Sequence, residues 1–131
     1  MIDDIFGKLE YKYNFYKYDD INLFGENYRL KIVVENDESN SVLVIQQNNY
    51  KIYKRYINEN QDKIIEMIKQ YFFDVYITNI DIYKEIKPQA IYFSRDGSWG
   101  LLFDTEVDSE NGFAIFYKDK ELHIGTQDMF I

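Results

Sequence analysis

The feature that most constrains the fold of this chain is a change of apolar periodicity along the sequence. Residues 60–77 repeat apolar side chains at helical spacing, whereas the segments on both sides are patterned like strands. An order of strands, helices and strands is typical of an α+β fold. We expect an antiparallel sheet, made of an N-terminal hairpin and a C-terminal meander, with one long and one or two shorter helices on one face. The helical stripe consists of Ile64, Ile65, Ile68, Phe72 and Val75.

Two alternating segments predict the N-terminal hairpin. Residues 6–18 alternate apolar and polar side chains, as does the stretch 28–35, and such alternation is typical of half-buried strands. The polar cluster 36–40 indicates a turn, and Asp19 with Asp20 is expected to break the first strand. The apolar side of that strand would consist of Leu9, Tyr11, Tyr13 and Phe15.

The middle of the chain is less regular. Residues 42–57 begin with a strand-like run, 42–45, but Tyr53 and Ile57 fit a helical face, so both a strand and a helix stay open. Residues 80–86 form a short amphipathic segment, which is the candidate for a shorter helix. The strands of the C-terminal meander are predicted over residues 90–93, 99–104, 112–117 and 121–124.

Length and composition restrict the classes of protein. A chain of 131 residues predicts a single domain, residues 1–131, that buries its own core. The absence of Cys excludes disulfides, thiolate nucleophiles and Cys-ligated metals, and the single His excludes multi-His metal sites. No apolar run approaches the roughly 20 residues that cross a bilayer, and the first residues carry acids rather than the bases of a signal peptide. We therefore expect a soluble cytoplasmic domain.

The acidic charge is concentrated in the second half of the chain. The formal net charge is −8. Residues 1–58 hold nine acids and eight bases, whereas residues 59–131 hold fourteen acids and seven bases. Such a field repels nucleic acids and anionic membranes, and it favours the approach of a basic protein. The alternative is an acidic surface that serves solubility alone.

Four acids recur at every second position between residues 104 and 110. If the stretch is extended, their carboxylates line one face, and their repulsion favours a cation or a basic partner. The spacing does not fit a calcium-binding EF-hand loop, because positions 6 and 12 are Ser109 and Ile115 rather than Gly and Glu. We therefore predict a contact site for a protein partner, with no metal or other cofactor, and a solvated loop as the alternative. The four acids are Asp104, Glu106, Asp108 and Glu110.

The sequence contains no recognisable catalytic motif. There is no Gly-x-Ser-x-Gly, no phosphate-binding loop with its Lys and no dinucleotide-binding glycine pattern. His123 lies in a predicted strand without an identifiable nucleophile to serve, and Trp99 is expected to anchor the core. We therefore expect that the protein is not an enzyme.

Short motifs follow one another in the last third of the chain. They combine turn glycines, aromatic residues and a closing Gln-Asp pair. Earlier matches are Gln46 or Gln47, Tyr50, Tyr53 and the step 58–61 into the predicted helix. The motifs of the last third are 87–93 (KPQAIYF), 99–104 (WGLLFD), 110–117 (ENGFAIFY) and 124–128 (IGTQD).

This series resembles a family of small bacterial domains of unknown function, several of which lie among the immunity proteins of polymorphic toxin systems. The resemblance covers roughly residues 45–128. Members of that family often carry His before the Gly of the last hairpin, where this chain has Asn111. The resemblance implies binding of a toxin, and it provides no catalytic residues to transfer.

Together, charge and resemblance predict a non-catalytic, acidic protein-binding domain, an immunity protein that occludes a basic toxin. The acids at 104–110 would steer association, and exposed tyrosines would supply the anchors of the interface. One alternative is a small enzyme or ligand-binding domain with a carboxylate site, which could include a divalent metal. Another is a housekeeping domain that assembles with itself, for example as a homodimer.

Overall fold

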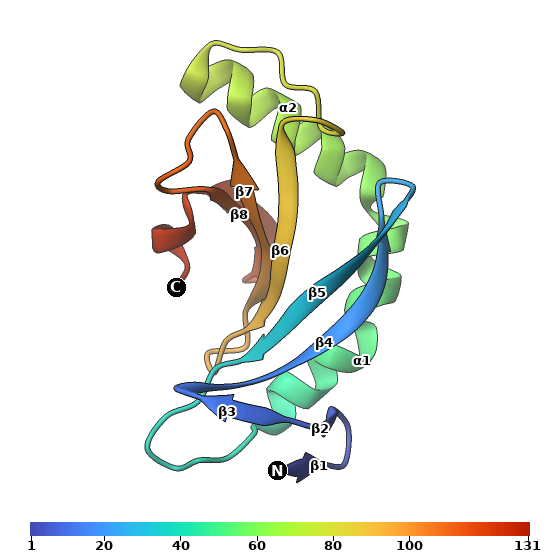
Figure 1. The fold of residues 1–131 in the computed structure, drawn as a ribbon, viewed down its shortest axis with the longest axis vertical. Coiled ribbons are helices and arrows are strands. Elements are labelled where there is room, and N and C mark those ends of the chain that lie inside the picture. Colours follow the sequence, from blue (N-terminus) through green and yellow to red (C-terminus); the bar gives the residue numbers. More distant parts are fainter.

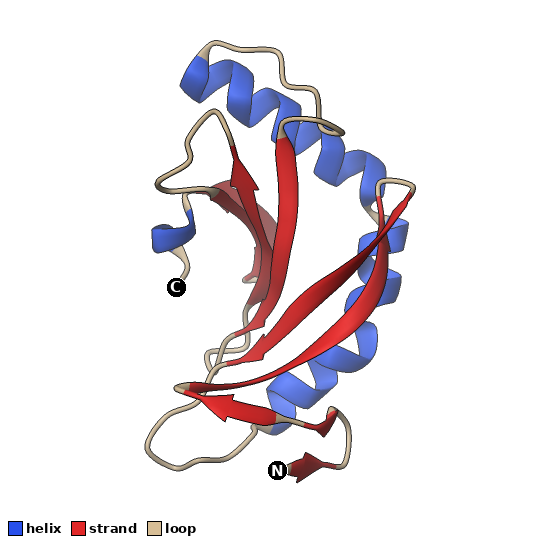
Figure 2. Cartoon of the chain, viewed as in Figure 1, coloured by secondary structure: helices blue, strands red, loops and turns tan.

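The computed structural model describes residues 1–131 as two helices packed on a curved sheet (Figure 1). Both helices lie on one side of the sheet, and the short C-terminal helix η1 lies on the other (Figure 2). The elements in chain order are β1 (Ile2–Asp3), β2 (Gly7–Lys8), β3 (Glu10–Lys12), β4 (Asn14–Leu23), β5 (Glu26–Val34), α1 (Val44–Glu59), α2 (Gln61–Tyr76), β6 (Ile86–Phe93), β7 (Trp99–Thr105), β8 (Phe113–Lys118), β9 (Glu121–Gly125) and η1 (Gln127–Met129).

The main sheet has seven strands in sequence order from β3 to β9, and β1 pairs with β2 in a separate small hairpin. All neighbours in the main sheet are antiparallel except β5 and β6, which run parallel. This exception follows from the two helices between them, because a parallel pair needs a long crossover connection. The predicted α+β class, N-terminal hairpin and C-terminal meander are confirmed.

Residues 42–57, which both a strand and a helix could fit, are mainly helical. Tyr53 and Ile57 of α1 are buried against the sheet, whereas Val44 and Ile45 are exposed, so the apolar run at 42–45 is not a buried strand. In α2 the predicted stripe is buried at its centre, but Val75 at its end is 54% exposed. Val75 was wrongly expected in the core, because the last turn of α2 borders the edge of the sheet rather than its centre.

The single strand predicted over residues 6–18 is wrong, because this stretch is divided among β2, β3 and the start of β4. The chain reverses at Tyr13, which has a φ of 63°, and β3 pairs with β4 on either side of it. Tyr11 and Tyr13 are therefore 61% and 84% exposed instead of lining the core beside Phe15. The expected break at Asp19 is also absent, since β4 continues to Leu23.

No shorter helix forms at residues 80–86. The segment runs through turns, and Ile80, Ile82 and Ile86 are buried against the main core. Their apolar spacing thus reflects anchoring of an irregular connection. The second helix of the fold is instead α1, and at 16 residues it is as long as α2.

The core lies between the helices and the sheet, and Trp99 is 2% exposed within it, as predicted. A smaller apolar cluster lies on the opposite face, where the rings of Phe116 and Phe130 stack 4.8 Å apart. The glycine of the WGLLFD motif, Gly100, is required by close packing, because a Cβ at this position would clash with the Ile115 carbonyl and the Phe116 ring. None of the helices has the length and apolar character needed to span a membrane.

Candidate functional site

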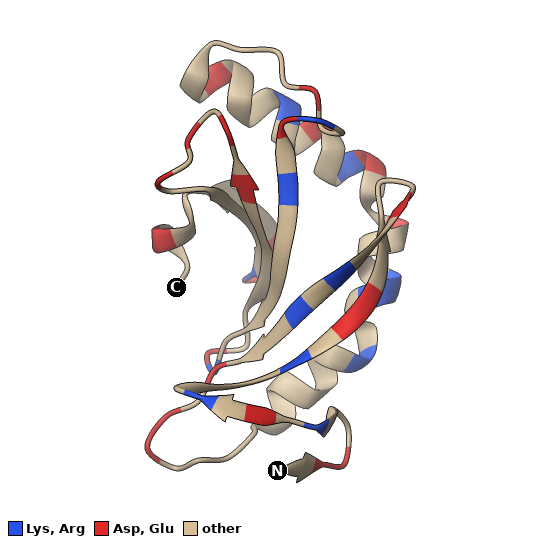
Figure 3. Ribbon diagram, viewed as in Figure 1, with Lys and Arg blue, Asp and Glu red and all other residues tan.

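The four acids of the predicted contact site lie at the end of β7 and in the loop that follows it (Figure 3). They do not form an extended row, so that expectation is wrong. Thr105 at the end of β7 is buried, and its hydroxyl accepts a 3.2 Å hydrogen bond from the amide of Val107, which bends the chain into turns. Asp104 stays on the strand, opposite Lys87 of β6, while the other three acids lie in the loop.

Asp108 is held by the fold. Its carboxylate accepts a 2.7 Å hydrogen bond from the hydroxyl of Tyr76 in α2 and further bonds from the amide and side chain of Asn111. The hydrogen bond from Tyr76 is the main reason that the pKa of Asp108 lies below its usual range. Asn111, at the position where the resembled family often has His, therefore supports the loop conformation.

The remaining three acids are exposed and unneutralised. Asp104, Glu106 and Glu110 lie on the surface, and none of them takes part in an ion pair. The adjacent end of α2 adds to this field, since its last turn contains Asp74 and no base. A helix C-terminus carries a partial negative charge of its own. Acids thus outnumber bases at this end of the molecule, where Lys84 and Lys87 are the bases that line an open pocket beside the loop.

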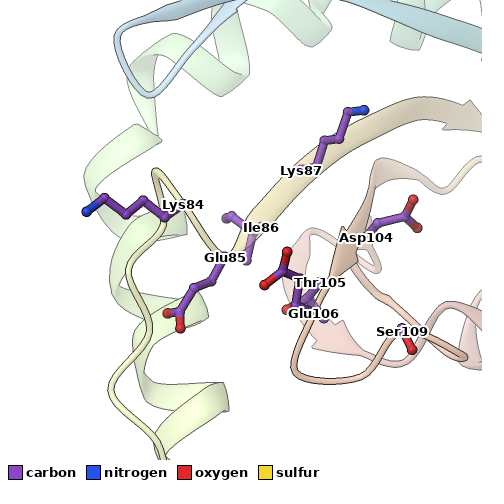
Figure 4. Close-up of a pocket in the computed structure, with 8 residues that line it drawn as sticks. All are labelled: Lys84, Glu85, Ile86, Lys87, Asp104, Thr105, Glu106 and Ser109. Atoms are coloured by element: carbon purple, nitrogen blue, oxygen red, sulfur yellow. The ribbon is translucent and has the colours of Figure 1, made fainter.

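The loop between β7 and β8, residues 106–112, is called the acidic loop below. An open pocket, the hollow, of about 350 Å³ lies beside it. The side chains around it do not converge: Lys84 and Lys87 point apart, and Asp104 and Glu85 point to opposite sides (Figure 4). No group of three or more His, Asp or Glu side chains is placed to hold a metal ion. The arrangement offers electrostatic attraction over a surface rather than a set of groups aimed at one reacting atom.

Exposed apolar side chains occur at the same end. Ile77, directly after α2, is 80% exposed and has a left-handed conformation with a φ of 54°. Tyr83, which directly precedes Lys84 of the hollow in the sequence, is 61% exposed, and Val107 is 36% exposed in the loop that contains the acids. The sequence analysis missed Ile77, although it and Phe73 form an i,i+4 apolar pair off the main stripe of α2, which was the available signal.

A second polar cluster, which the sequence analysis did not find, connects β4 to α1. The hydroxyls of Tyr50 and Tyr53 donate to the Asp19 carboxylate at 2.6 and 3.1 Å, and Lys17 lies 3.3 Å from the same group. Lys17 also donates to Tyr50 and to the carbonyl of Phe6. Burial raises the pKa of Asp19, but the Tyr50 hydrogen bond and the Lys17 charge outweigh it and lower that pKa below its usual range. The cluster is fully paired within the fold.

Comparison with known proteins gives no relative: no family model, no curated protein and no solved structure matches this chain. The resemblance drawn from the sequence motifs therefore stays a prediction. Several of its residues hold the fold together. Gln46 donates to the carbonyls of Glu35 and Phe93, and Gln127 donates to the carbonyl of Phe103.

Proposed function

We propose that this chain is a non-catalytic protein-binding domain, an immunity protein that occludes a basic toxin domain in a bacterial cytoplasm. The observation that carries the proposal is the coincidence of unneutralised acids and exposed apolar side chains at one end of the molecule. Glu106 and Glu110 have no basic neighbour within ion-pair distance, and Ile77 and Tyr83 expose most of their side chains. The sequence resemblance to a family of small bacterial domains of unknown function, several of which lie among immunity proteins, supports the same function.

The two kinds of side chain would act at different stages of binding. Long-range attraction between the acidic loop and Lys or Arg on the toxin would raise the rate of encounter. Burial of Tyr83 and Ile77 would then slow dissociation, because aromatic and aliphatic anchors at the centre of an interface supply most of its affinity. Inhibition would follow from steric occlusion, so that no residue of this chain needs to carry out a chemical step.

The structure shows which acids can be reversed in charge without disturbing the fold. Asp108 is unsuitable for charge reversal because it holds the loop, but Glu106 and Glu110 make no side-chain hydrogen bond or ion pair in the fold. A Glu106→Lys, Glu110→Lys double variant should fold normally and lose the partner. The matched control is Glu38→Lys, Glu66→Lys, which changes the net charge equally at exposed sites in the β5–α1 connection and in the middle of α2.

The experiment is capture of partners from the host lysate by each tagged protein, with identification by mass spectrometry. We expect one basic protein that binds the wild type and the control but not the loop variant. Co-expression of the wild type should then relieve the toxicity of that protein, whereas the loop variant should fail to do so. Equal capture by both variants would contradict the proposed site, and a captured protein that is not toxic would contradict the immunity function.

A further inference from the structure

The acidic loop ends in the pair Asn111-Gly112, and the fold uses both residues. The side-chain amide of Asn111 donates to the two carboxylate oxygens of Asp108, at 3.1 and 3.2 Å. Gly112 is buried with a φ of 58°, and a Cβ there would lie 2.5 Å from the Phe103 carbonyl and 2.6 Å from the side-chain amide of Gln127. Glycine is the residue that fits such a position. Another pair of residues here would change the shape of the loop.

An Asn-Gly pair is chemically labile. The backbone nitrogen of the glycine can attack the side-chain carbonyl carbon, Cγ, of the asparagine, because glycine has no side chain to hinder the approach. A bond forms from the Gly112 nitrogen to Asn111 Cγ, the Cγ–Nδ2 bond breaks, and ammonia leaves with the proton of the Gly112 amide. Water then opens the resulting cyclic imide at either carbonyl and leaves aspartate or isoaspartate. This is the only Asn-Gly pair in the chain.

Hydrogen bonds to Asp108 oppose each requirement of this reaction. The attack needs a free Gly112 nitrogen, but its N–H donates to the Asp108 carbonyl at 3.0 Å. The attack also needs the Asn111 carboxamide to turn toward that nitrogen, but its amide group is bonded to the Asp108 carboxylate. The charge of that carboxylate further opposes the negative charge that develops on the carboxamide oxygen. The closed loop should therefore protect its own labile pair for as long as Tyr76 holds Asp108.

We propose that Asn111 is a deamidation site that the closed acidic loop protects and that opening of the loop exposes. Local opening of a surface loop costs far less than unfolding of the whole domain, so the reactive state is reached within the folded protein. The aspartate product no longer donates to Asp108, and the two carboxylates repel each other. Isoaspartate in addition lengthens the backbone by one carbon next to the buried Gly112. Either product keeps the loop open, and the loss of ammonia makes the change permanent.

The test is peptide mapping by mass spectrometry during incubation of the full chain at mildly alkaline pH, with the chain in concentrated urea as the unprotected reference. Folded wild type should deamidate at Asn111 about tenfold or more slowly than the unfolded chain. Folded Tyr76→Phe should react roughly two- to fivefold faster than folded wild type, because it loses the bond that holds Asp108. Asn40, which precedes Ser41 in another loop, is the internal control, and its rate should differ by less than about twofold between the two folded proteins.

A pair of variants tests the effect of the product on the loop. Asn111→Asp reproduces the aspartate product, and it should speed amide exchange over residues 106–111 because it places two carboxylates together. Asn48→Asp is the matched control, since it makes the same change at an exposed position of α1. This control should leave exchange in the loop unchanged.

Equal rates of deamidation at Asn111 in folded and unfolded wild type would overturn the inference. So would equal rates in folded wild type and Tyr76→Phe, including no reaction in either, and so would unchanged exchange of the loop in Asn111→Asp. None of these measurements involves the toxin partner. A failure here is therefore distinguishable from a failure of the proposed function, which the charge variants of the acidic loop test separately.

Discussion

The hydroxyl of Tyr76 lies 2.7 Å from the Asp108 carboxylate and joins the end of α2 to a loop 32 residues further along the chain. This contact divides the four regularly spaced acids into two groups. Asp108 accepts hydrogen bonds that hold the loop, whereas Asp104, Glu106 and Glu110 are exposed and form no ion pair. The hydrogen bond therefore fixes the shape of the acidic loop without neutralising its field.

Removing this hydrogen bond should loosen the loop while the fold persists. Tyr76→Phe deletes the hydroxyl and keeps the packing of the ring against Phe72. We expect a loss of at most about 1 kcal/mol in the free energy of unfolding, because Asp108 is partly accessible to water. Amides of residues 106–111 should exchange faster in the variant, and those of β7 should not. Unchanged exchange in the loop would show that Tyr76 does not hold it.

The left-handed conformation of Ile77 should cost stability. A β-branched residue is strained at positive φ, and Gly is not, so Ile77→Gly should raise the free energy of unfolding by about 1 kcal/mol. Little packing is lost, since the side chain is 80% exposed. Val75→Gly, two residues earlier and inside the helix, is the control and should lower stability by roughly 0.5–1 kcal/mol. Urea unfolding measures both, and a destabilised Ile77→Gly would contradict the expectation.

The Asp19 cluster should make stability depend on pH. The pKa of Asp19 in the folded protein lies below the ordinary value of 3.8, so the ionised carboxylate stabilises the fold at pH values above 3.8. The contribution should be lost as the pH falls below 4 through the folded pKa. Asp19→Asn leaves Lys17, which is only partly buried, without its counter-charge and should cost roughly 1–2 kcal/mol at pH 7. The difference from wild type should shrink in acid, and a difference that stays constant down to pH 2 would contradict this account.

Gln46 should be essential to stability although it is polar. It is fully buried, accepts a hydrogen bond from the amide of Leu43 and donates to carbonyls at the ends of β5 and β6. Gln46→Leu leaves the amide of Leu43 and the carbonyl of Glu35 unpaired, which should cost roughly 2–4 kcal/mol, while the carbonyl of Phe93 keeps its bond from the amide of Glu35. Gln70→Leu, on the exposed face of α2, should stay within about 0.5 kcal/mol of wild type. Thermal unfolding of the two variants distinguishes a buried bridge from a dispensable amide.

Elements with one continuous periodicity were predictable from the sequence. The strands of the C-terminal meander contain continuous apolar runs that are buried on both faces of the sheet, and helix α2 repeats apolar side chains at helical spacing, so local pattern and tertiary burial agree there. Strand β6 begins at Ile86, four residues before the predicted strand 90–93, and its register shifts between Pro88 and Ala90. Residues 42–57 carried both patterns, and burial of Tyr53 and Ile57 against the sheet decided for the helix. Here the packing of α1 on distant strands supplied what the local pattern lacked.

The errors share a cause, which is that contacts distant in sequence override the local pattern. Tyr13 reverses the chain at positive φ without the Gly or Asn that would signal a turn. The alternating acids indicate an extended segment, but the bond between Asp108 and Tyr76 holds that segment in turns. The residues of the candidate site were predictable from charge spacing, whereas their division into one structural and three free acids was not.

The most direct test of the proposed function is the association rate of this chain with its captured basic partner at increasing ionic strength. If the acidic loop steers binding, the wild-type rate should fall steeply with salt, because screening shortens the reach of the field. The Glu106→Lys, Glu110→Lys variant should associate slowly even at low salt and respond weakly to added salt. Equal rates for wild type and variant at low salt would contradict the account.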